Sequence, residues 1–153
     1  MKTQSIRMVV VALVAAAGIL WFEQPAPAVL TTFTYTGAGA DPNVWGDEEN
    51  WLNGGVVNGY PTEVLNGETL AVIPDGKSPS FTTGVSNLYR LQTGSGTVSF
   101  NGGLSCHNAS PYNPSIAIGL GGVSVAGSVY ASRGPISTAG NLSITGNLQY
   151  WGQ

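Results

Sequence analysis

Few residues in this chain could carry out catalysis. It contains one histidine, His107, directly after one cysteine, Cys106, and neighbouring residues of a strand point to opposite faces. No Asp or Glu follows Asp75, so no acid stands near the histidine in sequence to orient its ring. The same absence removes from the predicted strands after Asp75 the pair of acids that glycosidases need, and one His with one Cys does not make a zinc site. We therefore expect no enzyme activity, no catalytic residue and no cofactor, with Cys106 as a small buried residue.

Calcium is the one ion for which the chain offers candidate ligands. Oxygen-bearing side chains surround Gly46 at alternating positions, namely Asp41, Asn43, Asp47 and Glu49. An EF-hand loop would need an oxygen ligand where Trp45 stands and a bidentate glutamate where Leu52 stands. These four residues are therefore a weak calcium candidate, and a solvated acidic loop is the favoured interpretation.

Two tryptophans of the same segment, Trp45 and Trp51, lie among turn-forming residues. A tryptophan in this context most often closes the open end of a small β core, because its ring covers a large apolar area at low entropic cost. We favour this capping role for both residues. A platform of exposed rings that binds sugars is the alternative.

The elements that must position these residues are predicted from the composition. The 153 residues include 22 Gly and 9 Pro, 8% are charged and 42% are hydrophobic. Intrinsic disorder requires low hydrophobicity and high charge, and helical bundles are rich in Ala, Glu, Lys and Leu, so both are excluded. A net charge of −3 argues against a nucleic-acid partner, because phosphates are bound by clustered Lys and Arg. An all-β protein remains.

The N-terminal residues 1–28 read as a signal peptide. Lys2 and Arg7 precede the apolar run Met8–Phe22, and small residues follow at Ala26-Pro27-Ala28. The run is shorter than the ~20 residues that span a bilayer comfortably, and a retained membrane anchor is the alternative. We expect cleavage after Ala28, a secreted protein at the cell surface or outside the cell, and no membrane contact in the mature form.

An internal repeat carries most of the structural information. Three segments align without gaps, at residues 97–106, 122–131 and 141–150. Each has Ser at its third and Gly at its sixth position, and hydrophobic and polar residues alternate along it. The recurrent Gly suits a corner that a side chain would obstruct. The alternation predicts one buried face, which in the third segment consists of Leu142, Ile144 and Leu148.

This repetition is typical of a parallel β-solenoid, or β-helix, in which equivalent strands of successive coils stack on one another. An antiparallel sandwich is the alternative, although it does not explain why the segments agree position by position. We predict an all-β fold in which residues 64–153 form about four coils and residues 29–63 form an N-terminal strand and cap segment. Further strands are expected at residues 70–73, 85–91 and 115–118, and an exposed strand at 31–36.

The opening of the predicted mature chain has a distinctive order of residues. It consists of Tyr35-Thr36-Gly37, Trp45, Asn50-Trp51, Gly54-Gly55, Pro61 and the strand Leu70–Ile73. This order resembles the opening of β-helical, autotransporter-like and PEP-CTERM-type secreted bacterial proteins, although Tyr35 replaces their first Trp. The segment Gly122–Val129 is similar to their repeated strands. The resemblance implies an extracellular or cell-surface solenoid and transfers no catalytic residue.

The sequence leaves two classes of function open. The first is a secreted structural protein that polymerises head to tail with copies of itself into an extracellular or cell-surface filament. Residues 141–153 contain no charge and no Pro that would discourage pairing with another chain, and the strand near residue 31 would add to a neighbour. The predicted assembly interface is Thr31, Phe33, Tyr35, Leu148, Tyr150 and Trp151. The alternative is a monomeric adhesin that binds cell-surface glycans through Trp45, Trp51, Tyr130 and Trp151.

Overall fold

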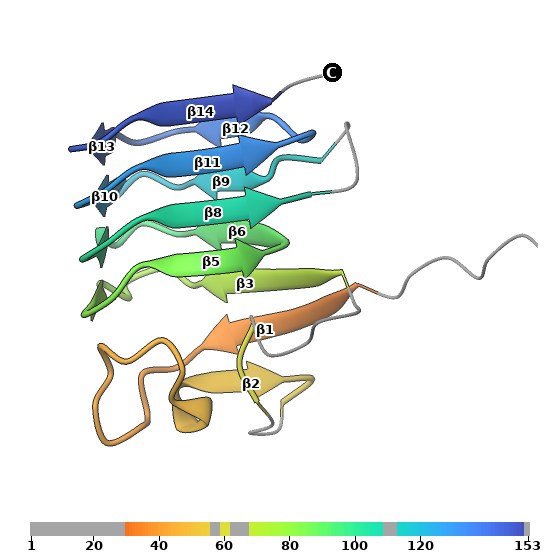
Figure 1. Cartoon of the computed structure of the whole chain (residues 1–153). Helices are drawn as coiled ribbons and strands as arrows, with labels where there is room; N and C mark the ends of the chain where they lie inside the picture. Colours follow the sequence, from red (N-terminus) through yellow and green to blue (C-terminus); the bar gives the residue numbers. More distant parts are fainter. Residues whose placement is uncertain (1–29, 56–58, 62–67, 109–112, 152–153) are drawn as a thin grey trace, which may run out of the picture.

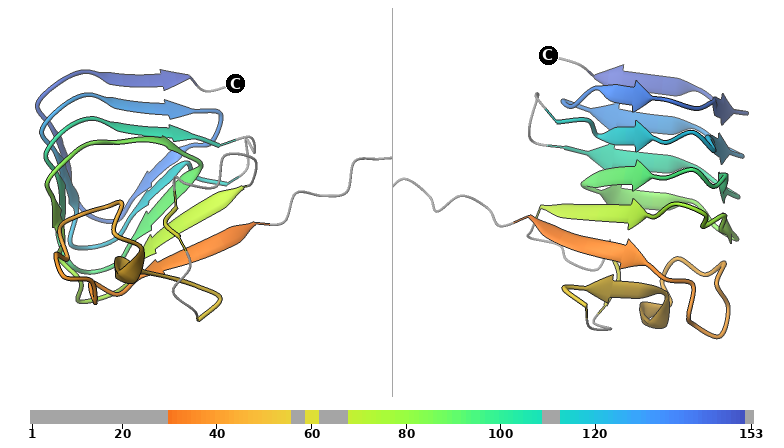
Figure 2. Two further views of the ribbon diagram at one scale, coloured as in Figure 1. Left: turned by 60° about the horizontal axis from the view of Figure 1, so that its bottom comes forward. Right: turned by 180° about the vertical axis from the view of Figure 1, so that it is seen from behind.

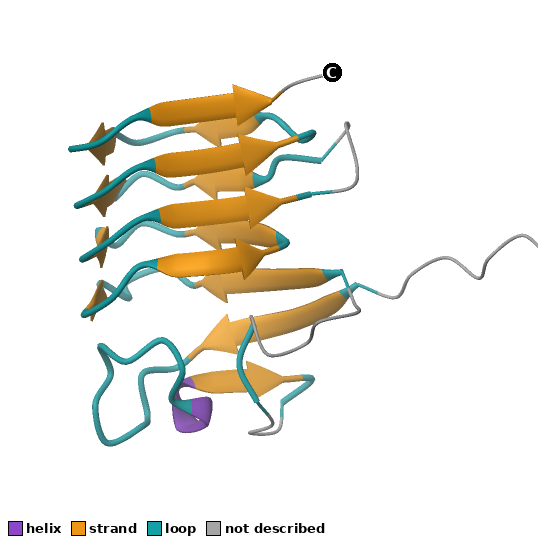
Figure 3. Ribbon diagram, in the orientation of Figure 1, coloured by secondary structure: helices purple, strands orange, loops and turns teal. Residues whose placement is uncertain are grey.

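The computed structural model describes residues 30–55, 59–61, 68–108 and 113–151 (Figure 1). These residues form strands, turns and loops, with one short 3-10 helix, η1 (Glu48–Asn50) (Figure 3). The predicted all-β class is therefore confirmed. No helix in these ranges is long and apolar enough to cross a membrane. The predicted signal peptide, residues 1–28, and the predicted boundary between residues 63 and 64 lie outside the described residues.

The strands form three sheets. Sheet A has the order β12 (Ile136–Thr138), β9 (Ile116–Ile118), β6 (Arg90–Thr93), β3 (Thr69–Ile73), β1 (Thr31–Tyr35), β2 (Trp51–Asn53). Sheet B has the order β13 (Leu142–Ile144), β10 (Val123–Val125), β7 (Val98–Phe100), β4 (Ser80–Phe81). Sheet C has the order β14 (Leu148–Trp151), β11 (Val129–Ser132), β8 (Leu104–His107), β5 (Val85–Leu88). All pairs are parallel except β1 with β2, which rules out the antiparallel sandwich.

From β3 onward the chain visits the sheets in a fixed order. Successive strands lie in sheet A, sheet B and then sheet C, and each pairs with the equivalent strand of the next round. We call each round a triplet, and the triplets are β3–β4–β5, β6–β7–β8, β9–β10–β11 and β12–β13–β14. The three sheets surround a common interior that holds the hydrophobic core (Figure 2).

The three sequence repeats lie on one another in the predicted register. The stacked inward positions are Val98–Val123–Leu142 and Phe100–Val125–Ile144 in sheet B, and Leu104–Val129–Leu148 and Cys106–Ala131–Tyr150 in sheet C. The serines of the repeats are stacked in the same way, at Ser99, Ser124 and Ser143. The position-by-position stacking that the sequence predicts is therefore confirmed.

Glycine is required at the corner between sheets B and C. Gly102, Gly127 and Gly146 each follow a strand of sheet B, where the backbones of successive triplets come close together. A Cβ on Gly127 would lie 2.7 Å from the backbone nitrogen of Gly103, and one on Gly146 would lie 2.7 Å from the carbonyl carbon of Gly127. Real Cβ atoms do not approach other atoms so closely, so the corners stack at this spacing only without side chains.

The predicted strand over residues 85–91 is in fact two strands. The chain bends at Tyr89, so that β5 ends in sheet C and β6 begins in sheet A. Val85, Leu88 and Leu91 are all buried. A spacing of three residues is incompatible with the two-residue period of a regular strand. The irregular pairing within β5, where Asn87 has a positive φ, lets both Val85 and Leu88 face the core, and the bend at Tyr89 does the same for Leu91.

The strand at residues 31–36 is not the exposed strand that the sequence predicts. It is β1, which lies between β2 and β3 and is paired on both edges. Phe33 and Tyr35 are buried. Thr31, Phe33 and Tyr35 therefore do not form an assembly interface here, because the edges that could accept a neighbouring chain are already used within the chain.

The fourth triplet is less buried than the sequence predicts. Leu142 and Ile144 are only partly buried, and Leu148 is 52% exposed, so Leu148 is not a core residue. The equivalent residues of the third triplet, such as Val125 and Val129, are fully buried. The reason is that the third triplet lies between two others, whereas the fourth has a described neighbour on one side only.

The middle triplets require apolar side chains at their inward positions. Val125 is 0% exposed, so Val125→Asp would bury an unpaired charge, and we expect it to lower the free energy of unfolding by about 4 kcal/mol or more. The next residue, Ala126, is exposed, and Ala126→Asp is the matched control with an expected change within about 0.5 kcal/mol. Urea unfolding followed by circular dichroism measures both. A Val125→Asp variant as stable as the control would contradict the inward register of sheet B.

Candidate functional site

Aromatic rings fill the N-terminal end of the core. Trp45 and Trp51, the predicted cap residues, are both buried, and their ring centroids are 4.7 Å apart. The ring of Trp45 also lies 5.0 Å from Phe81 of β4 and 5.9 Å from Phe100 of β7. These contacts join the segment before β3 to the first two triplets. Neither tryptophan presents a face to solvent, so the two cannot form the sugar-binding platform that was the alternative.

Tyr35 belongs to the same aromatic cluster. Its ring lies 5.4 Å from that of Trp51, and its hydroxyl donates a hydrogen bond to the carbonyl oxygen of Pro42 at 2.6 Å. Burial, with a smaller contribution from the nearby charge of Asp41, raises the pKa of Tyr35 above its ordinary value. The phenol therefore stays protonated and keeps its hydrogen bond to the loop.

Asn50 organises the loop that carries Trp45. Its side chain is fully buried, and its amide nitrogen donates to the carbonyl oxygens of Asp41 at 2.8 Å and Val44 at 3.0 Å. Its side-chain oxygen accepts a hydrogen bond from the backbone N–H of Gly39 at 2.9 Å. Sequence reasoning finds Asn50 only as part of the family resemblance, because its three partners come together only in the folded loop.

The candidate calcium ligands do not converge. Asp41 Oδ1 accepts from the backbone N–H of Asn43 at 2.9 Å, and Asp47 Oδ1 caps η1 by accepting from the N–H of Glu49 at 3.1 Å. Asn43 Oδ1 accepts from the N–H of Ser80 at 3.0 Å. These oxygens hold turns and a strand edge, and the described residues contain no group of three or more Asp, Glu, His or Cys side chains that could hold a metal.

Cys106 and His107 lie on opposite faces of β8, as the alternation predicts. Cys106 is fully buried, and burial raises the pKa of its thiol far above the ordinary value, so its reactive thiolate does not form at neutral pH. His107 is exposed, and its Nε2 lies 2.9 Å from Ser105 Oγ. Ser105 and His107 are thus neighbouring side chains on the outer face of β8.

The C-terminal end of the stack presents an open edge. β12, β13 and β14 each have a partner on one side only among the described strands. Leu148, Tyr150 and Trp151 are 52%, 50% and 66% exposed. Leu148 and Tyr150 hold inward positions, in register with Val129 and Ala131 of the third triplet. These three residues of the predicted assembly interface are therefore accessible.

The opposite end of the stack is poorly suited to pairing with another chain. The outermost strand of sheet A, β2, is short and antiparallel to β1. In sheet B, Asn43 already accepts the backbone N–H groups of Ser80 and Thr82 along β4, with its side-chain and its carbonyl oxygen. In sheet C, the pairing of β5 is irregular, and Asn87 has a left-handed backbone with φ of 60°. Short, covered or irregular edges are how sheets avoid pairing with other chains.

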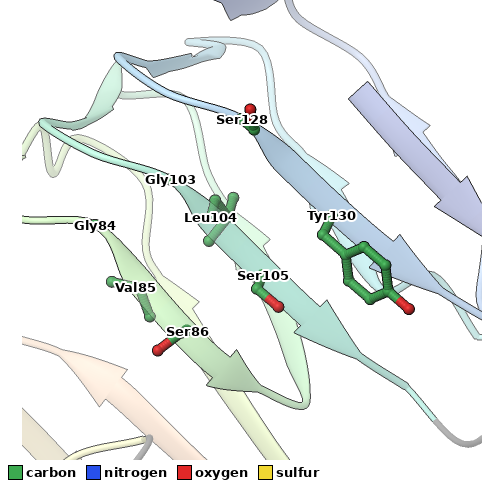
Figure 4. A pocket seen from close by; sticks show the side chains of 8 residues that line it. All are labelled: Gly84, Val85, Ser86, Gly103, Leu104, Ser105, Ser128 and Tyr130. Atoms are coloured by element: carbon green, nitrogen blue, oxygen red, sulfur yellow. The ribbon is translucent and has the colours of Figure 1, made fainter. Parts of the chain in front are cut away.

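A shallow groove of about 330 Å³ lies on the outer face of sheet C (Figure 4). It is lined by Gly84, Gly103, the hydroxyls of Ser86, Ser105 and Ser128, and the ring of Tyr130, with Val85 and Leu104 beneath. No lining residue is charged. Alternation places Ser105 and Tyr130 on the outward face, but the groove itself depends on how three strands lie side by side.

Replacement of each cap tryptophan by phenylalanine is expected to lower the free energy of unfolding by a different amount. Trp51 Nε1 donates to the carbonyl oxygen of Trp45 at 2.8 Å, whereas Trp45 Nε1 is buried without a hydrogen-bond partner among the described residues. We therefore expect Trp51→Phe to lower stability by about 1–3 kcal/mol more than Trp45→Phe, because only the former leaves a buried carbonyl oxygen unpaired. Urea unfolding of the two variants measures the difference. Equal losses would show that the hydrogen bond does not hold the cap.

Comparison with known proteins adds no assignment. No family model, no curated protein and no solved structure matches the chain. The resemblance of the opening segment to secreted β-helical bacterial proteins therefore stays a prediction. The two accessible features from which a function can be argued are the open C-terminal end and the groove on sheet C.

Proposed function

We propose that this chain is a secreted structural protein whose four triplets are the coils of a short β-solenoid, and that it associates with copies of itself through its C-terminal end. The charged and apolar pattern of residues 1–28 supports secretion. The repeated strand order and the in-register ladders support the solenoid. The single observation that carries the association is the open edge of the fourth triplet with its exposed inward residues.

An uncovered end of this kind is unfavourable in water. Among the described residues, the backbone groups along the outer edge of β12, β13 and β14 have no ladder partner, and side chains in core positions stay in contact with solvent. Complete burial of a leucine contributes about 1.5–3 kcal/mol, and Leu148, at 52% exposure, still has about half of this to gain. No charged residue follows Arg133 in the chain, so two such ends do not repel each other.

The C-terminal ends of two copies fit each other better than a C-terminal end fits an N-terminal end. The head-to-tail polymer predicted from the sequence would pair the fourth triplet with β2, β4 and β5 of the next copy. Those edges are short, irregular or already occupied by Asn43. Addition of the strand at residues 31–36 is unavailable as well, because β1 is paired on both edges. We therefore propose two copies joined at their C-terminal ends in place of the filament.

A two-fold axis perpendicular to the stack would bring the two ends together. Inverting one copy reverses the sense in which its chain runs around the interior, so facing strands across the contact run in opposite directions. Antiparallel pairing satisfies backbone N–H and C=O groups at least as well as parallel pairing. Such an interface is self-complementary and closed, so growth stops at two copies.

The proposal is tested by the molecular mass of the exported chain, without residues 1–28, in solution. We expect a dimer whose fraction rises with protein concentration in analytical ultracentrifugation. The double variant Leu148→Lys, Tyr150→Lys places charges of one sign on both sides of the contact and is expected to be monomeric with an unchanged circular dichroism spectrum. Leu120→Lys is the matched control, because Leu120 is 77% exposed but lies at a corner of the third triplet, and it should dimerise like the wild type.

Two other outcomes would contradict parts of this proposal. Open-ended filaments in electron micrographs would contradict the two-fold arrangement and favour head-to-tail stacking. A wild-type protein that stays monomeric at the highest attainable concentration would contradict self-association altogether.

A further inference from the structure

The ring of Tyr130 stands at the side of the groove on sheet C without a large side chain opposite it. Tyr130 is paired with Ser105 of β8, and Ser86 of β5 lies on the far side of the groove (Figure 4). The ring of Tyr130 also contacts that of His107, which lies on β8 two residues after Ser105, and the two ring centroids are 5.0 Å apart. The tyrosine is therefore held in place while one side of it borders an open, accessible space.

Two glycines, Gly84 and Gly103, lie at the bottom of the groove and add no side chain to it. A Cβ on Gly84 would lie 2.5 Å from the carbonyl oxygen of Gly103, and a Cβ on Gly103 would lie 3.1 Å from that of Ser128. The close approach of successive triplets thus leaves no room for a side chain at Gly84 and little at Gly103. A ligand in the groove can consequently approach the backbone of sheet C.

The lining has the chemistry that suits an uncharged sugar. Ser86, Ser105 and Ser128 supply hydroxyls that both donate and accept hydrogen bonds, as the hydroxyls of a sugar do. The ring of Tyr130 offers an apolar face against which the C–H groups of a sugar ring can pack. The volume of about 330 Å³ is at the lower end of the range for small-molecule sites, about 300–1,000 Å³. We infer that this groove binds a neutral carbohydrate, with one sugar ring stacked on Tyr130.

Other ligand classes fit the groove less well. A charged ligand would meet no counter-charge among the lining residues, because none of them is Asp, Glu, Lys, Arg or His. An extended peptide usually binds by pairing with a strand edge, but the groove lies on the face of sheet C, where β8 and β11 are paired on both edges.

A second groove of the molecule provides an internal contrast. It lies on the outer face of sheet B, has a similar volume of about 320 Å³ and is lined by small polar residues that include Ser80, Ser99 and Ser124. Its aromatic residues, Phe81 and Phe100, are buried in the core and present no ring to a ligand. We expect sugars to bind on sheet C and not on sheet B, although both surfaces carry serine hydroxyls.

The inference is independent of self-association and is tested on the exported chain by isothermal titration calorimetry. The probes are soluble hexaoses of glucose, xylose and N-acetylglucosamine, and we expect at least one of them to bind. Tyr130→Ala should weaken its binding about tenfold or more, whereas Tyr130→Phe, which keeps the ring, should bind nearly as well as the wild type. Tyr150→Ala is the matched control, because Tyr150 is at the inward side of the C-terminal strand, and its sugar affinity should be unchanged even if its dimerisation is not.

A second variant tests the groove without removing the tyrosine. Ser105→Leu fills the groove from the outer face, leaves the core untouched and should abolish sugar binding while the thermal unfolding curve stays as in the wild type. Failure of all three hexaoses to bind would overturn the inference. It would also be overturned if Tyr130→Ala and Ser105→Leu, both folded, bound the sugar like the wild type, or if a proline-rich peptide bound in the groove and no sugar did.

Discussion

The parallel register between successive triplets is the constraint on which the rest of this structure depends. Each strand from β3 onward pairs with the equivalent strand of a neighbouring triplet, so the side chains stack in ladders of similar residues, such as Val98 on Val123 on Leu142. A slip of one residue would turn every inward side chain of a strand outwards. The corner glycines belong to the same constraint, because the triplets can approach to the strand spacing of ~4.8 Å only where no Cβ intervenes.

In a stack of this kind, the outermost described strands at each end have backbone N–H and C=O groups without a partner in the next triplet. The two ends of this structure differ in how far they are covered. At the N-terminal end, Trp45, Trp51 and Tyr35 cover the core, Asn50 holds the covering loop and Asn43 pairs with the edge of β4. At the C-terminal end, core positions such as Leu148 and Tyr150 remain half exposed in the described residues. This asymmetry is the physical reason why we propose association at the C-terminal end only.

The register that stacks the inward side chains also fixes the positions of the side chains on the outer faces of the sheets. Because the inward residues are in register, the outward residues are in register as well, and serine residues stack in a ladder on sheet B. On sheet C the outward residue paired with Ser105 is Tyr130, and its ring borders a groove whose other outward side chains are serines. Acidic residues end at Asp75 in the sequence, before most of the strands, so these faces offer hydroxyls and a ring for recognition and no paired carboxylates for hydrolysis.

The all-β class, the stacking of the three repeats and the inward positions of Val98, Val125 and Cys106 could be predicted from the sequence, because alternation and repetition are properties of residues close together in the chain. The outward positions of Ser105 and Tyr130 followed in the same way. Only the tertiary structure decided that β1 is enclosed by β2 and β3, that the chain turns at Tyr89, that Asn50 binds Gly39, Asp41 and Val44, and that Leu148 is exposed. Each of these depends on which segments lie side by side in the fold, and the period of a single strand does not encode that.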